Sequence, residues 1–202
     1  MDLQSILFDF DGVLCRDRFY RATLLPDHQD ICDWIQANIF SDKELTHKWM
    51  RGQTDSAAIN RLISEKTGIG YELLNGLYEE SIRSMKLEAE LVDLARSLKA
   101  VGKKIGIVTD NMDVFTRITI PNHRLSELFH VVINSADHGL LKRDENGRLF
   151  DIALGKLGSG IEDSLMIDDN ATTIELYKQK GGQGFVYHAN TPELTALLQS
   201  KK

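Results

Sequence analysis

The chain has 202 residues, 42% hydrophobic and 27% charged, and a formal net charge of -6 at pH 7, which is typical of a globular protein. The acidic balance, without a lysine- and arginine-rich block, argues against nucleic-acid binding, and no apolar run approaches the roughly 20 residues of a membrane span. Because there is no signal-peptide pattern and the two cysteines form no disulfide framework, we expect a cytoplasmic protein.

The first predicted element is a buried strand in "QSILFDF", and it ends in two carboxylates. Asp9 and Asp11 lie one residue apart, and Gly12 follows them directly. Two like charges at the rim of an apolar strand are costly unless a cation or a reaction requires them. An aspartate at a strand end can also do no more than cap a turn. The pair is therefore a candidate cation site or catalytic site, with a turn as the alternative.

The pattern of apolar residues changes in residues 16–86, which contain no convincing strand. Apolar residues recur there at helical spacing in "DICDWIQANIF", "SDKELTHKWMRG", "TDSAAINRLISEKTG" and "YELLNGLYEESIRSMK". Ser41 and Thr54 stand before acidic residues, where helix N-caps are expected. The pattern predicts an all-helical subdomain inserted after the first strand.

Strands and helices alternate in the rest of the chain. Four further strands are predicted in "KKIGIVTD", "HVVINSAD", "DSLMIDD" and "GQGFVYH", and they alternate with helical stretches such as "ELVDLARSLKAVG", "RLFDIALGKLG", "TTIELYKQKGG" and "TPELTALLQSKK". This alternation predicts an α/β fold in which helices cover both faces of a parallel sheet.

Polar residues collect at the carboxyl ends of these strands, where ligands bind in an open parallel sheet. They are Asp9, Asp11, Thr109, Asp110, Asn111, Lys142, Asp168, Asp169 and Asn170. Each could be a helix cap or a surface residue, but carboxylates on separate strands at one rim repel each other. Magnesium would remove that repulsion, and it suits a site that has few carboxylates and room for phosphate oxygens.

Four motifs in order, "FDFDGVL", "VTDN", Lys142 and "MIDDN", resemble those of the haloacid dehalogenase superfamily of phosphohydrolases. The helical insert after the first motif resembles that family's small α-helical cap. The resemblance spans essentially the whole chain. It implies a Rossmann-like parallel-sheet core at residues 1–15 and 87–202 and a cap at residues 16–86.

The resemblance also implies catalytic roles. Asp9 would be the nucleophile that forms an aspartyl-phosphate intermediate. Asp11 would act as general acid on the leaving alcohol and then as general base on water. Lys142 would neutralise charge in the transition state. A proline commonly follows the family's lysine, whereas a polar turn, "RDENGRL", follows here, so Arg143 and Lys156 remain competitors for this role.

The remaining implied roles concern magnesium and phosphate. Mg²⁺ would be held by the Asp9 carboxylate, the Asp11 backbone carbonyl and Asp169, while Asp168 orients bound water; the two adjacent aspartates could also exchange roles. Gly12 would keep a side chain away from the phosphate.

Phosphate oxygens would be bound by Thr109 and by the amides after it, at Asp110 and Asn111. The cap would carry specificity, and its candidate substrate-binding residues are Arg18, Trp49 and Arg51. The alternative interpretation packs Trp49 in the core of the cap and leaves the arginines in solvent.

Together these features predict a magnesium-dependent phosphomonoester hydrolase that acts on a small phosphorylated metabolite, such as a sugar phosphate. A phosphomutase shares the first half-reaction. A dehalogenase would need neither Asp11 nor a pair of carboxylates that bind magnesium. A non-catalytic regulatory or binding relative could keep the same fold.

Overall fold

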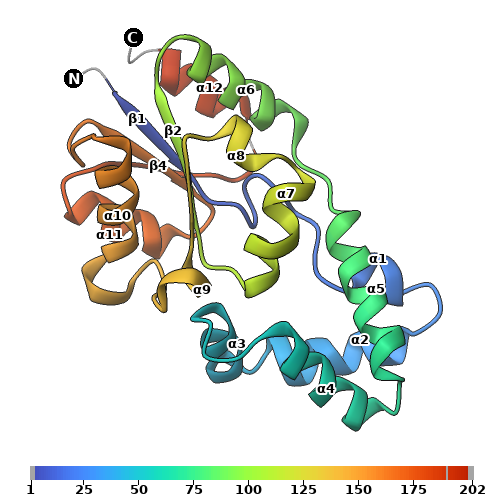
Figure 1. The fold of residues 1–202 in the computed structure, drawn as a ribbon. Helices are drawn as coiled ribbons and strands as arrows, with labels where there is room; N and C mark the ends of the chain where they lie inside the picture. Colours follow the sequence, from blue (N-terminus) through green and yellow to red (C-terminus); the bar gives the residue numbers. More distant parts are fainter. Residues whose placement is uncertain (1–2, 190, 200–202) are drawn as a thin grey trace.

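The core of the molecule is a five-stranded parallel sheet in the order β3-β2-β1-β4-β5 (Figure 1). The computed structural model describes residues 3–189 and 191–199. Its strands are β1 (Ser5–Phe8), β2 (Lys104–Thr109), β3 (Val131–Asn134), β4 (Ser164–Asp168) and β5 (Gln183–Val186). All five strands predicted from the sequence are present, which confirms the α/β, Rossmann-like fold.

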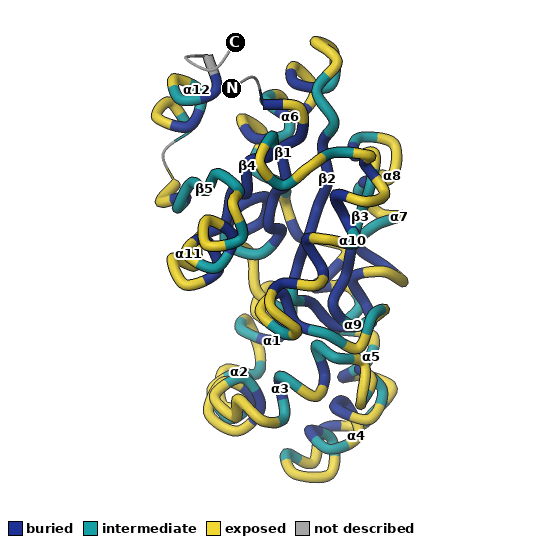
Figure 2. Tube along the Cα trace, turned by 90° about the vertical axis from the view of Figure 1, so that its left-hand side faces the viewer, coloured by how far each residue is buried: buried dark blue, intermediate teal, exposed yellow. Residues whose placement is uncertain are grey.

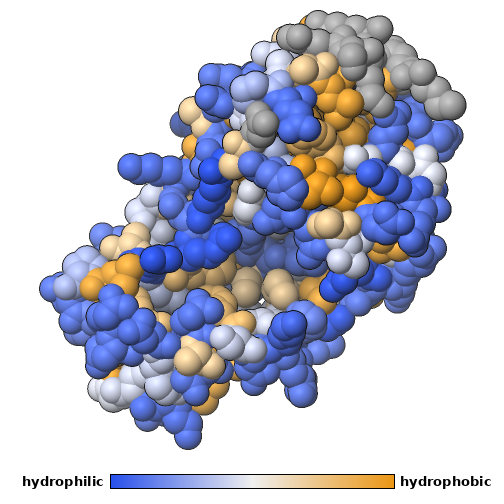
Figure 3. All heavy atoms as spheres, turned by 180° about the vertical axis from the view of Figure 1, so that it is seen from behind, coloured by the Kyte–Doolittle hydropathy of each residue, from blue (hydrophilic) through white to orange (hydrophobic). Residues whose placement is uncertain are grey.

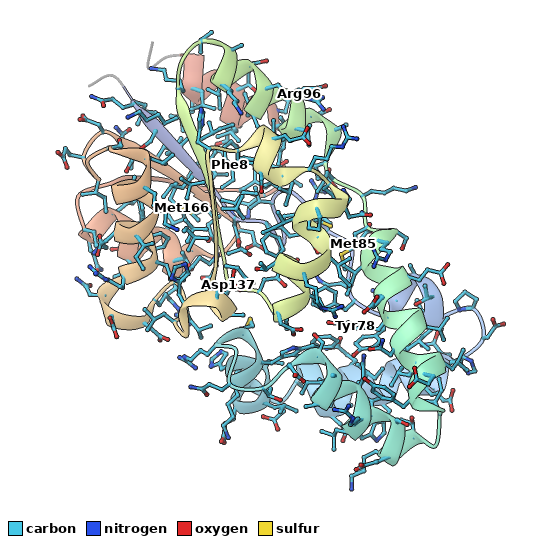
Figure 4. The ribbon with its side chains drawn as sticks, in the orientation of Figure 1. Phe8, Tyr78, Met85, Arg96, Asp137 and Met166 are labelled. Carbon is cyan, nitrogen blue, oxygen red and sulfur yellow. The ribbon has the colours of Figure 1, made fainter. Side chains whose placement is uncertain are left out.

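Helices cover both faces of this sheet. The last helix before β2 is α6 (Ala89–Ala100). The helices after β2 are α7 (Ile120–Asn122), α8 (Leu125–Leu128), α9 (Ser135–His138), α10 (Arg148–Leu157), α11 (Ala171–Gln179) and α12 (Thr191–Gln199), with a π-helix, η2 (Phe115–Thr119), and a short 3₁₀-helix, η3 (Asp144–Asn146). α10 and α11 pack on one face, and α6 and α8 pack on the other. Phe8 and Met166 point to opposite faces (Figure 4). β1 and β4 are buried throughout, whereas β5 at the sheet edge is half-buried (Figure 2).

All elements assigned between β1 and β2 are helices. Before α6 these are α1 (Arg21–Leu24), α2 (Gln29–Ile35), a π-helix η1 (Gln36–Phe40), α3 (Lys43–Met50), α4 (Ser56–Thr67) and α5 (Tyr71–Arg83). We call residues 21–83 the helical segment. It lies beyond the carboxyl end of β1, beside the sheet core (Figure 1). No helix among the described residues is long and apolar enough to cross a membrane.

Two helix starts in this segment differ from the prediction by one residue. The N-caps of α3 and α4 are Asp42 and Asp55, whose carboxylates accept the backbone N–H groups of Leu45 and Ala58. Ser41 and Thr54, the predicted caps, lie one position earlier. An aspartate accepts these bonds as a charged group beside the positive end of the helix dipole, which favours it over the neighbouring hydroxyl.

The corner between α3 and α4 is joined closely to the sheet core. Asp113 accepts the indole N–H of Trp49 (3.1 Å) and the backbone N–H of Ser56 (2.9 Å). Gly52 has a φ of +64°, and a Cβ there would lie 2.5 Å from the Ala136 carbonyl oxygen. Only glycine therefore lets the two backbones approach this closely.

Candidate active site

Three carboxylates meet at the carboxyl ends of β1 and β4. Asp9 follows β1 directly, and Asp168 is the last residue of β4, which pairs with β1. Asp9, Asp168 and Asp169 each offer one oxygen, and these oxygens lie within 4.8 Å of one another. Asp9 and Asp168 are buried, whereas Asp169 is exposed. Oxygen ligands in this number and spacing suit a hard divalent cation.

A buried ammonium lies within this cluster. The Nζ of Lys142 is 2.8 Å from Asp9 Oδ2 and 2.6 Å from Asp168 Oδ2, and its side chain is 5% exposed. The Lys142 backbone N–H also donates to Asp110 (2.7 Å). Arg143 and Lys156, the competing basic residues, are exposed. The structure thus places Lys142, and neither competitor, between the two buried carboxylates.

Burial shifts the titration of these groups. It raises the pKa of Asp9 above its usual range, an effect that the Lys142 ammonium offsets only in part, and it raises the pKa of Asp11 to about 6. Although burial disfavours the Lys142 ammonium, Asp9 and Asp168 raise its pKa well above the usual value. The carboxylates of Asp9, Asp11, Asp168 and Asp169 outnumber the cations of Lys142 and Arg18 beside them, so a further cation would stabilise their ionised forms.

The two adjacent aspartates have different environments. Asp168 accepts the Asn170 N–H through Oδ1 and the Lys142 ammonium through Oδ2, so both of its oxygens are engaged. The Asp169 carboxylate instead lies against Gly12, where a Cβ would collide with it. Gly12, at a φ of +81°, makes room for this carboxylate, whereas the sequence suggested room for the phosphate. Asp169 is thus the freer of the two to bind a cation.

Gly12→Ala is expected to weaken cation binding about 10- to 100-fold, because the new Cβ displaces the Asp169 carboxylate. A magnesium titration followed by calorimetry would measure the change. Gly102→Ala is a matched control, since Gly102 has a similar φ of +84° but nothing within 4 Å of the added Cβ. Equal magnesium affinities in the two variants would contradict the assigned role of Gly12.

Asn111, just after β2, forms a hydrogen bond with Asp11. Asn111 donates its side-chain amide to Asp11 Oδ2 (2.8 Å), while its own oxygen accepts the Met112 N–H (2.9 Å). The sequence predicted that the backbone N–H of Asn111 binds phosphate. In the structure this N–H instead donates to Ser135 Oγ (2.9 Å). The hydroxyl of Thr109 is buried and has no partner among the described residues, a costly arrangement that a phosphate oxygen would relieve.

A cavity of about 440 Å³ opens over the aspartates and Lys142, and we call it the catalytic cavity; Thr109 and Asn111 are not among the described residues that line it. Asp9, Asp11, Asp110, Lys142 and Asp169 are among its lining residues.

Arg18, Trp49 and Arg51, the three residues of the predicted cap (16–86) that were expected to bind substrate, have different positions. Arg18 and Arg51 line the catalytic cavity, although Arg51 is paired with Asp144 through two bonds of 2.8 and 3.0 Å. Trp49 is fully buried and is not brought to the cavity, because its indole packs inside the segment and donates to Asp113. Trp49 therefore packs in the interior, as the alternative interpretation of the sequence held, and does not bind substrate from the cavity wall.

Sequence reasoning missed three residues that shape this site: Asp113, Ser135 and Asp144. Ser135 donates to the Met50 carbonyl (2.6 Å) and accepts the Asn111 N–H, so it joins the helical segment to the β2 end. Asp144 holds both Arg51 and the Leu141 N–H. The signal in the sequence was their position: Asp113 and Ser135 come shortly after β2 and β3, and Asp144 lies in the connection from β3 to β4.

Solved structures resemble the whole molecule. A predicted HAD-like family hydrolase from Porphyromonas gingivalis has a TM-score of 0.75 at 19% identity, covering 98% of this chain and 99% of that one. A HAD family enzyme from Bacteroides thetaiotaomicron, in complex with magnesium and inorganic phosphate, has a TM-score of 0.69 at 16% identity, covering 93% and 96%. L-2-haloacid dehalogenase from Xanthobacter autotrophicus, with chloropropionic acid covalently bound, has a TM-score of 0.65 at 14% identity, covering 98% and 83%. At these identities the likeness concerns the fold.

The family itself follows from the sequence match. A comparison with curated proteins gave no match. The family model of haloacid dehalogenase-like hydrolases, however, matches residues 3–179, a stretch that contains all three clustered carboxylates and Lys142. With the motifs matched and their side chains converging at one rim of the sheet, the chain belongs to the haloacid dehalogenase-like hydrolases.

Proposed function

We propose that this chain is a magnesium-dependent phosphomonoester hydrolase that works through an aspartyl-phosphate intermediate on Asp9. The observation that carries the proposal is the cluster of Asp9, Asp168 and Asp169 around the Lys142 ammonium, with Asp11 two residues after Asp9. A phosphoryl group needs a fixed nucleophile, positive charge and a proton donor for its leaving oxygen. All three fall within this one cluster.

The first step uses groups that the fold holds in place. Asp9 accepts the Phe10 N–H through Oδ1 (2.7 Å) and the Lys142 ammonium through Oδ2, which fixes its carboxylate. An Asp9 oxygen attacks phosphorus, and the ester P–O bond breaks as Asp11 gives its proton to the departing alcohol oxygen. Asn111 holds Asp11 in position for this transfer. Lys142 offsets charge on the phosphoryl oxygens.

The second step hydrolyses the intermediate. Asp11, now ionised, takes a proton from water as the water oxygen bonds to phosphorus and the acyl phosphate bond breaks. Inorganic phosphate leaves, and both aspartates return to their starting states. The raised pKa of Asp11, about 6 because of burial, suits a group that both gives and takes a proton near neutral pH.

Magnesium would be held by the carboxylates of Asp9 and Asp169 and the backbone carbonyl of Asp11, with Asp168 orienting bound water. When bound, it would neutralise the repulsion between a carboxylate nucleophile and a phosphate dianion. The excess of negative charge among these carboxylates supports this fit. The solved relative that binds magnesium and phosphate supports it by analogy.

Residues 16–86 are proposed as the cap over a core of residues 1–15 and 87–202. The position of Arg18 and Arg51 on the catalytic cavity supports this division. A cap of this size excludes water from the reacting groups and admits a small phosphorylated metabolite better than a phosphoprotein.

Two other reactions of the same fold need separate tests. A dehalogenase expels a halide, which needs no proton, so Asp11 and the Asp169 cluster would have no role there. A phosphomutase differs only in passing the phosphoryl group to a second alcohol instead of water. The test is a panel of phosphate esters with magnesium or with a chelator, alongside 2-chloropropionate. Chelator-sensitive phosphate release supports the proposal, and halide release without phosphate release contradicts it.

The two adjacent aspartates are expected to differ in their effect on magnesium dependence. Asp169→Ala should raise the magnesium concentration for half-maximal activity steeply, since a direct ligand is lost. Asp168→Ala should raise it less, about 10- to 100-fold, as is usual for residues that act through a ligand or bound water. Magnesium titrations of both variants measure this concentration. A larger increase in Asp168→Ala than in Asp169→Ala would show that Asp168 is the direct ligand.

A further inference from the structure

A second cavity continues from the catalytic cavity into the helical segment. It has a volume of about 540 Å³, within the range of small-molecule sites. Asp11, Arg18, Met50 and Asp110 line both cavities, so the second begins beside the group that protonates the leaving alcohol. A hollow is visible between the core and the helical segment in Figure 3. We call this second space the leaving-group cavity.

The walls of the leaving-group cavity are chemically unlike those of the catalytic cavity. The catalytic cavity is lined mainly by charged side chains. The leaving-group cavity combines polar residues with an apolar wall. Its apolar side chains are Phe19, Leu25, Ile35, Phe40, Met50, Met85 and Met112, and Asp11, Asp17, Arg18 and Asp110 are among its charged ones. Met85 lies where the chain passes from α5 back to the core (Figure 4). Polarisable methionines and aromatic rings together favour contact with a flat apolar group.

Two of the wall residues belong to a built aromatic cluster. The rings of Phe19 and Phe40 lie 6.5 Å apart, and Phe40 lies nearly parallel to Trp49 at 6.3 Å. Phe19 also meets Tyr78 edge to face at 5.7 Å. Trp49 and Tyr78 are fully buried, so they support the two half-buried rings from behind. The aromatic wall is therefore held in place before any ligand binds.

The chain beside Phe19 adopts an unusual conformation that maintains this wall. Tyr20 has a φ of +65°, a left-handed conformation that a tyrosine rarely takes. Its backbone N–H donates to Ser81 (2.9 Å), its hydroxyl to Asn60 (2.5 Å), and its ring stacks on Tyr78 at 4.5 Å. These contacts retain a strained residue between two cavity residues, Phe19 and Arg21, as is common at ligand sites.

Part of the cavity lining is polar and exposed. Arg21, Gln29, Asp33 and Gln36 are exposed and line the cavity from α1, α2 and η1. They offer both hydrogen-bond donors and acceptors, with charges of both signs. An occupant could therefore pack its body on the apolar wall and place its polar substituents against these groups.

We propose that the leaving group is an alcohol with a flat, mainly apolar body, such as an aryl or heteroaryl methanol, and that polyhydroxylated sugars are poor substrates. The inference rests on the proposed phosphatase function. A sugar hydroxyl that faces Phe19, Phe40 or the methionines would lose water without gaining a partner on that wall. An aromatic ring there buries apolar surface on both sides.

The first test compares phosphate release from four probes. Benzyl phosphate and 2-naphthylmethyl phosphate carry the ring, ribose 5-phosphate carries hydroxyls, and acetyl phosphate carries neither. We expect kcat/KM for the ring esters to exceed that for ribose 5-phosphate on the order of 100-fold. Hydrolysis of acetyl phosphate with equal or better use of ribose 5-phosphate would overturn the inference and leave the phosphatase function standing. No magnesium-dependent release from any probe would instead contradict the proposed function.

The second test fills the cavity. Cys32 lines it from α2 and is half-buried, so Cys32→Phe would place a ring where the ligand body lies. The ratio of kcat/KM for 2-naphthylmethyl phosphate to that for acetyl phosphate should fall at least about 10-fold. A ratio is independent of the folded fraction, so partial misfolding does not obscure the result. Ala37→Phe, at an exposed position of η1 outside the cavity, should leave the ratio unchanged.

A third variant addresses the aromatic wall itself. Phe19→Leu keeps an apolar side chain but removes the ring, and it should lower the same ratio several-fold. An unchanged ratio in both Cys32→Phe and Phe19→Leu would show that the ligand body lies elsewhere, which overturns the assignment of this cavity.

Discussion

Asp9→Asn is expected to lower phosphate release by about four orders of magnitude or more, because the variant loses the atom that attacks phosphorus. The carboxamide has the same size and can still accept the Phe10 N–H, so the fold should persist. Steady-state kinetics with a ring ester and with acetyl phosphate would measure the loss. Circular dichroism and the unfolding midpoint would show whether the variant is folded.

Two further measurements make this result specific to Asp9. Beryllium fluoride, which mimics a phosphoryl group on a carboxylate, should inhibit the unmodified enzyme and should not bind Asp9→Asn. Asp30→Asn changes an exposed carboxylate on α2 and serves as the matched control, with activity unchanged. If Asp9→Asn keeps more than a trace of activity in a clean preparation, another group is the nucleophile.

Lys142→Met is expected to lower the free energy of unfolding by about 3–5 kcal/mol at pH 8, since it leaves buried carboxylates without their ammonium. Lys142 is 2.8 Å from Asp9 and 2.6 Å from Asp168, and all three side chains are buried. Urea denaturation without added magnesium would measure the change. Lys156→Met removes an exposed lysine of α10 and should cost little.

The loss should depend on pH in a defined direction. In the unmodified protein the raised pKa of Lys142 keeps its contribution constant below the unfolded value of about 10.4. Burial raises the pKa of Asp9 to about 8 in the unmodified protein, and removal of the Lys142 ammonium raises it further. Both proteins therefore lose stability as pH rises above the unfolded value of about 3.9, but above about 8 this loss continues only in Lys142→Met. The deficit should therefore be larger at pH 9 than at pH 7. A deficit that is constant, or larger at pH 7, would contradict this account.

Much of the architecture was predictable because the signals are local. Apolar runs bounded by polar turns predicted all five strands, and parallel strands bring their carboxyl ends to one rim. The meeting of Asp9 with Asp168 and Asp169 follows from that geometry without any knowledge of side-chain packing. The two displaced N-caps show the limit of local reasoning, because Ser41 and Asp42 both fit the pattern and only the backbone geometry separates them.

The contacts of the helical segment were not predictable, because they join residues far apart in the sequence. Trp49 pairs with Asp113, and Arg51 pairs with Asp144 at a separation of 93 residues. Helical periodicity shows that a residue lies on one face of a helix but not what that face meets. The choice of Lys142 over Arg143 likewise depends on burial, which adjacent positions in a turn do not reveal.

The pairing of β1 has a consequence for the order of assembly. β1 is made first, yet its two neighbours in the sheet come much later: Ser5 pairs with Lys104 on one side and with Ser164 on the other. Closing such long loops slows folding, and the apolar β1 must wait without partners during synthesis. The helical segment can form in the meantime and shortens the path between β1 and β2. Since Asp168 and Asp169 arrive with β4, the carboxylate cluster is completed only after most of the chain has been made, and a nascent chain stalled before residue 164 would carry Asp9 but no cation site.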